Sequence, residues 1–130
     1  MAITPFGRCA RSALLIPSPR VDQVEELLRR LALNDEKSVG MVLMSESDPE
    51  ADVALVPKVD LLVRLGALVA VGAATASLRR TVQLALAAGA TEAEIVGVLV
   101  AVAPTVGLAR VVSTAPKLAD AIGYDVASDE

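Results

Sequence analysis

The apolar side chains of this sequence are unusually small. Apolar residues make up 54% of the 130 positions, yet the chain has one Phe, one Tyr and no Trp. Ala, Val and Leu therefore carry the apolar content, and side chains of this size suit closely packed helices. One small core does not require so large an apolar fraction, because a domain of this length leaves much of its surface facing water. We therefore expect a single domain, residues 1–130, whose surplus apolar surface lies between the subunits of a homo-oligomer.

The chain contains no histidine and a single cysteine, Cys9. Zinc sites of the usual kinds and Ser–His or Cys–His nucleophile pairs are therefore excluded. A lone cysteine cannot form an intramolecular disulfide, which fits a reducing cytoplasm. The sequence predicts a cytoplasmic protein with no metal site and no cofactor.

The charge balance argues against nucleic acid and membrane partners. Twelve Lys and Arg residues against sixteen Asp and Glu residues give a net charge of −4, which repels a phosphate backbone. The uncharged runs at 65–78 and 95–109 are shorter than the roughly 20 apolar residues that span a bilayer. The apolar stretch at 13–16 is too short for a secretion signal. We interpret residues 1–18, which contain arginines but no acid, as an N-terminal arm.

The first half of the chain predicts two helices and a loop. Ser18-Pro19 suits a helix entry, and apolar residues recur at three- and four-residue steps over 19–33. Asn34-Asp35 ends this helix and is positioned to cap a shorter, weakly periodic one that contains Gly40. Residues 45–52 are polar and contain Pro49, which predicts a loop.

The second half predicts four more helices, giving an all-α fold of about six. One begins at Pro57 and continues to about Gly72, apolar nearly all round, and another covers 74–88 and stops at Gly89. Thr91 and Glu94 match the capping box that starts a helix, which Pro104 is expected to kink or break. The last helix is expected over 105–121, with a division at Pro116 left open, ending near Gly123.

Residues 84–95, with the turn Gly89-Ala90-Thr91 and the later Gly107, resemble the carboxymuconolactone decarboxylase and alkylhydroperoxidase D-like family. The segment 57–63 resembles the lysine-containing helix that precedes this turn in the family, and Ala93 replaces a usual glutamate. The likeness covers about residues 55–121. It implies an all-helical, alkylhydroperoxidase D-like fold that assembles into trimers or hexamers.

The resemblance also implies that the family's usual chemistry is missing. The redox branch carries two cysteines and a histidine at the positions of Ala74, Ser77 and Thr81. The decarboxylase branch uses a histidine at the position of Thr81, and often another near Ala101. Neither Ala nor an unassisted Thr is a general acid or base near neutral pH. We therefore expect neither thiol peroxidase nor histidine-dependent decarboxylase activity.

The remaining candidates for ligand binding fall into two polar groups. Ser77 and Thr81 share a helix face and could bind a ligand, although such hydroxyls more often bond the carbonyl one turn back. Arg80, beside Arg79, could clamp a carboxylate; the alternatives are a solvated edge or an intersubunit ion pair. A second group consists of Lys58, Asp60 and Arg64, with ordinary surface charge as the alternative.

Two functions remain open at the level of the sequence. In the first, the chain is a diverged family member that binds a small organic acid or apolar metabolite in a helical pocket, with residual lyase or isomerase chemistry through Asp60 or an arginine. In the second, it is a catalytically inactive structural or interaction protein that acts through its oligomer. We favour the first by analogy, because a family that keeps its fold often keeps its pocket.

Overall fold

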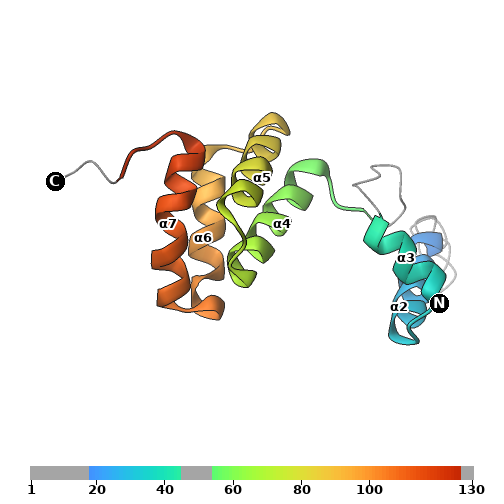
Figure 1. Cartoon of the computed structure of the whole chain (residues 1–130). Coiled ribbons are helices and arrows are strands. Elements are labelled where there is room, and N and C mark those ends of the chain that lie inside the picture. Colours follow the sequence, from blue (N-terminus) through green and yellow to red (C-terminus); the bar gives the residue numbers. More distant parts are fainter. Residues whose placement is uncertain (1–17, 45–53, 127–130) are drawn as a thin grey trace, which may run out of the picture. The chain divides into compact units, whose positions relative to one another are not determined.

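A computed structural model describes residues 18–44 and 54–126, and this part of the chain is helical with no strand (Figure 1). The predicted all-α fold of about six helices is confirmed. Its helices are α2 (Ser18–Ala32), α3 (Glu36–Met44), α4 (Pro57–Val71), α5 (Thr75–Ala87), α6 (Glu92–Val106) and α7 (Leu108–Ile122). The chain divides into two compact units, residues 1–54 and 55–130, so the single domain stays a prediction. The predicted arm up to residue 17 and the loop at 45–52 lie outside the described residues.

Helices α2 and α3 form the first unit. Two ion pairs support α2, and each joins side chains one helical turn apart. They are Glu25–Arg29 at 2.9 Å and Glu26–Arg30 at 2.7 Å. Asn34 adopts a left-handed conformation, φ 55°, where α2 ends. Asp35 then caps α3, because its Oδ2 accepts hydrogen bonds from the Ser38 backbone N–H at 3.0 Å and from the Ser38 hydroxyl at 2.6 Å. The break predicted at Asn34-Asp35 is therefore confirmed.

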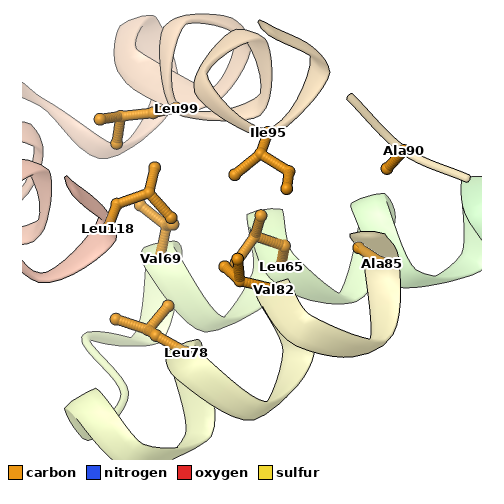
Figure 2. Packing of buried hydrophobic residues seen from close by; sticks show 9 residues of the cluster. All are labelled: Leu65, Val69, Leu78, Val82, Ala85, Ala90, Ile95, Leu99 and Leu118. Carbon is orange, nitrogen blue, oxygen red and sulfur yellow. The ribbon is translucent and has the colours of Figure 1, made fainter. Parts of the chain in front are cut away.

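The second unit is a four-helix bundle arranged as a ring. Going round it, α4 packs on α5, α5 on α7, α7 on α6, and α6 on α4. Figure 2 shows side chains from all four helices converging on one core. Gly66 allows α4 to approach α6 closely, since a Cβ added there would lie 3.3 Å from Cγ1 of Val102. The buried core consists of Leu65, Val69, Leu78, Val82, Ala85, Ala90, Ile95, Leu99 and Leu118.

Glycines in left-handed conformations end the helices of the bundle where the sequence predicted. Gly72 (φ 69°) follows α4, Gly89 (φ 96°) follows α5 and Gly123 (φ 92°) follows α7. Thr91 and Glu94 form the predicted capping box at the start of α6. No helix in the described part of the chain is long and apolar enough to cross a membrane.

The two prolines do not divide the last two helices, which corrects the expectation of a helix break at Pro104, while the kink expected there as the alternative stays a prediction. Helix α6 continues through Pro104 to Val106, and α7 starts at Leu108 rather than near 105. Pro116 lies within an unbroken α7. Each proline removes one backbone hydrogen bond, from the carbonyl four residues earlier. Both prolines lie on exposed sides of their helices, where solvent can satisfy the freed carbonyl, so packing of the opposite side maintains the helix.

Candidate functional site

Helix α5 brings part of the predicted site together on one flank. Its inward residues Leu78, Val82 and Ala85 are buried in the core. The flank next to this buried side carries four residues that lie within about one third of the helix circumference at 100° per residue. Ser77 and Arg80 are exposed, Thr81 is half-buried, and Leu84 is 46% exposed. We call Ser77, Arg80, Thr81 and Leu84 the α5 face.

The two neighbouring arginines of α5 have different partners. Arg79 forms an ion pair with Asp120 of α7, which ties these helices together. Arg80 has no carboxylate within ion-pair distance among residues 18–44 and 54–126. A guanidinium group presents N–H donors in a planar fork that matches a carboxylate. Arg80 is therefore the arginine of this pair that is available to a bound anion.

The second predicted group, Lys58, Asp60 and Arg64, separates into two ion pairs. Lys58 Nζ lies 3.0 Å from Glu94 Oε1, which links α4 to α6. Arg64 Nε lies 2.8 Å from Asp60 Oδ2, one turn apart on α4. All three side chains therefore have partners within the protein, and a role for them in ligand binding stays a prediction.

Glu94 has a larger role than the sequence indicated. One carboxylate oxygen accepts from the Thr91 backbone N–H at 2.9 Å and the other accepts from Lys58. These hydrogen bonds, first that of Thr91 and then that of Lys58, lower the pKa of Glu94. Sequence reasoning found the capping box but missed Lys58 as a partner, because 36 residues separate the two side chains.

A hollow of about 380 Å³ lies at the end of α7, and Asp120, the ion-pair partner of Arg79, is among the residues that line it. Beside it, the Tyr124 hydroxyl donates to Glu92 Oε2 at 2.8 Å, and this carboxylate raises the pKa of Tyr124. The hollow is open and no predicted candidate lines it, so we do not assign it a ligand. No group of three or more potential metal ligands occurs in the part of the chain that the structure describes. The lining residues are Pro116, Asp120, Gly123, Tyr124, Asp125 and Val126.

Arg110 makes a contact that no sequence pattern indicated. It lies near the start of α7, and its guanidinium group packs against Gly72 at the end of α4. A Cβ built on Gly72 would lie 1.9 Å from Arg110 Nη1. Because Gly72 has no side chain, it leaves room for the guanidinium group of Arg110. For the same reason it can adopt the left-handed backbone conformation.

Comparison with known families identifies the bundle. A model of the carboxymuconolactone decarboxylase family matches residues 43–121, more than half of the chain. The chain belongs to the carboxymuconolactone decarboxylase family. The matched region begins 12 residues before the segment 55–121 in which the sequence analysis found the resemblance. Both regions end at residue 121. No curated protein and no solved structure matches the chain.

Within this carboxymuconolactone decarboxylase family member, the reactive positions implied by the resemblance lie between the residue before α5 and the middle of that helix. Ala74 is the residue that precedes the helix, and Ser77 and Thr81 belong to the α5 face. The sequence has no histidine, and its one cysteine is at position 9. These positions therefore offer hydroxyl groups for hydrogen bonding, and they offer neither a thiolate nor an imidazole.

Proposed function

We propose that this family member binds a small organic acid, or a small apolar metabolite with a carboxylate, on the α5 face. The proposal rests on the surroundings of Arg80. This side chain has no ion-pair partner in the described residues, and it lies beside the hydroxyl side chains of Ser77 and Thr81. Arg80 would take the carboxylate, and Ser77 and Thr81 would hydrogen-bond a second polar group. Leu84 would contact the apolar part of the ligand.

The proposal favours binding over catalysis. Asp60 is the candidate base for residual lyase or isomerase chemistry, but it is ion-paired with Arg64 at 2.8 Å. A general base must lie within hydrogen-bond reach of the proton that it abstracts, and Asp60 belongs to α4 rather than to the α5 face. We therefore propose that any non-redox lyase or isomerase activity is secondary to ligand binding.

We further propose that the protein is a cytoplasmic homo-oligomer, a trimer or hexamer. The α5 face is open in a single chain, since Ser77 and Arg80 are exposed, and ligand pockets usually bury most of a ligand's surface. A neighbouring copy would supply the missing cover. Large apolar side chains such as Val63, Val100 and Leu108 are also exposed in one chain, and subunit contacts would bury them.

The alternative function is a catalytically inactive structural or interaction protein that acts through its oligomer. The exposed apolar side chains support this alternative equally well, because they require a covering surface and no ligand. The two functions differ in one measurable property. A ligand that binds only the folded state raises the melting temperature, whereas a purely structural oligomer has no such ligand.

The test is a thermal-shift screen of small mono- and dicarboxylic acids against the full-length protein and two variants. At about 100 times its Kd, a ligand stabilises the folded state by about 2.7 kcal/mol. Arg80→Ala should abolish the shift. Arg79→Ala is the matched control, because it removes the neighbouring arginine, which is paired with Asp120. This pair is exposed, so the starting melting temperature should change little, and the ligand-induced rise should be kept.

Two outcomes would contradict the proposal. If no acid in the screen raises the melting temperature of the wild-type protein, the structural alternative is favoured. If Arg79→Ala removes the ligand-induced rise as completely as Arg80→Ala does, the ligand is not held by the α5 face.

A further inference from the structure

Helix α6 is apolar all round, yet the bundle covers only one side of it. Its charged residues, Glu92 and Glu94, lie in the first turn, and none follows from 95 to 106. Ile95 and Leu99 are buried in the core. A helix that is apolar on every side is normally buried on every side. The remaining side is exposed, and we call it the α6 outer face: Ala93, Val96, Gly97, Val100, Ala101 and Pro104.

The α6 outer face has a ridge and a furrow side by side. Val96, Val100 and Pro104 follow one another at four-residue steps and form the ridge; Val96 is 43% exposed and Val100 is 67% exposed. Ala93, Gly97 and Ala101 follow at the same steps and form the furrow. At the centre of the furrow, a Cβ added to Gly97 would meet no atom within 4 Å. Rows of this spacing are the ones through which helices pack ridges into grooves.

We propose that the α6 outer face binds the same face of a second copy across a two-fold axis. A face that presents a ridge and a furrow of equal length is complementary to itself, as a two-fold interface requires. With the helices antiparallel, Gly97 lies opposite Val100 of the second copy. In the same register Ala93 lies opposite Pro104 of the second copy, and Ala101 lies opposite Val96. Each small residue therefore packs against a larger one.

Charge selects the antiparallel arrangement. The carboxylates of α6 lie at its N-terminal end, and a helix of 15 residues is about 22 Å long. Antiparallel pairing keeps the two acidic ends about that far apart. Parallel pairing would bring four carboxylates together and align the two helix dipoles unfavourably. The uncharged centre of the face also suits an identical apolar partner better than a charged one, which would lose its hydration there.

This interface is independent of the proposed ligand site. Helices α5 and α6 both pack against α4 and α7, and they lie on opposite sides of the four-helix ring. Ligand binding on α5 and pairing through α6 can therefore fail separately. A two-fold contact also requires an even number of chains, which favours a hexamer over a trimer.

The first test is the mass of the full-length assembly, measured by size-exclusion chromatography with light scattering. The wild-type protein should contain an even number of 13.4 kDa chains, and Gly97→Gln should halve the mass. The substitution should leave the bundle folded, because position 97 is open and glutamine is a better helix former than glycine. Ala109→Gln, at an exposed position of α7 outside both the α5 face and the α6 outer face, is the control and should keep the wild-type mass.

A second test checks the register by cross-linking. In a Cys9→Ser background, the double variant Val96→Cys/Ala101→Cys should form a covalent dimer on oxidation, while each single variant should stay uncross-linked. A wild-type protein with one chain or an odd number of chains would overturn the proposal. So would a Gly97→Gln variant of wild-type mass. Failure of the folded double variant to cross-link would overturn the antiparallel register.

Discussion

Replacing Gly72 by Ala should destabilise the protein for two separable reasons. Gly72 has φ 69° and ψ 43°, and a side chain in this left-handed region costs about 1–2 kcal/mol. The new Cβ would also lie 1.9 Å from Arg110 Nη1 and 2.9 Å from Cζ, so the half-buried guanidinium group must move. Gly72 is exposed and the displaced atoms are the end of a flexible side chain, so moving Arg110 out of its preferred rotamer costs only about 0.5–1.5 kcal/mol. We therefore expect Gly72→Ala to lower the free energy of unfolding by about 1.5–3.5 kcal/mol.

Two further variants separate the backbone effect from the contact with Arg110. Gly123 has φ 92°, and an added Cβ there meets no atom within 4 Å. Gly123→Ala should therefore lose only the backbone contribution, about 1–2 kcal/mol. In an Arg110→Ala background, Gly72→Ala should cost about as much as Gly123→Ala does. The double-mutant cycle of Gly72 and Arg110 should then give a coupling free energy of about 0.5–1.5 kcal/mol.

The assay is urea unfolding followed by far-ultraviolet circular dichroism. All variants should be compared at one protein concentration, because assembly changes the apparent stability. A Gly72→Ala variant that costs no more than Gly123→Ala would refute the contribution of the Arg110 contact. The same contribution would be refuted if Gly72→Ala lowered the free energy of unfolding equally with and without the Arg110 side chain.

Four other predictions concern the core, the capping box and Tyr124. Leu65 is fully buried, so Leu65→Ala should reduce the free energy of unfolding in urea by about 2–5 kcal/mol; a loss below about 1 kcal/mol would contradict its place in the core. Thr91→Ala should cost about 1 kcal/mol in the same assay through loss of the cap, and no change would contradict the capping box. The pKa of Glu94 is lowered in the folded state, so its stabilising contribution is present above its ordinary pKa and is lost as the pH falls through the folded value. Glu94→Gln should therefore flatten the acid side of the stability profile, and an unchanged slope would contradict this. Glu92 raises the pKa of Tyr124, so Glu92→Gln should shift the ultraviolet titration of the phenol to lower pH; an unmoved curve would count against the hydrogen bond.

The sequence was informative about the candidate site where chemistry depends on residue type alone. The absence of histidine and the single cysteine exclude imidazole and paired-thiol chemistry by composition, wherever the side chains lie in space. The four-residue spacing of Ser77 and Thr81 placed both on one side of a helix. It could not show that Arg79 pairs with Asp120 while Arg80 has no such partner in the described residues, because Asp120 is 41 residues away from Arg79.

Proline was the weakest guide to the fold. Pro104 was expected to kink or break its helix, and a division at Pro116 was left open, because proline removes a hydrogen bond in any helix. Whether a helix tolerates that loss depends on which side the proline occupies and on what packs opposite. Both depend on the neighbouring helices rather than on the local sequence.

Except between α6 and α7, the sequence by itself determined the helix boundaries, where a few neighbouring residues decide the backbone conformation. Asn34-Asp35, the capping box of Thr91 and Glu94, and the left-handed glycines at 72, 89 and 123 all act within one turn of the chain. Only the tertiary structure decided which sides of α4 and α6 are buried. These helices are apolar nearly all round, so their periodicity does not distinguish an inner side from an outer one. Only the positions of the other helices around the ring decide which side is covered, and contacts between residues distant in sequence fix those positions.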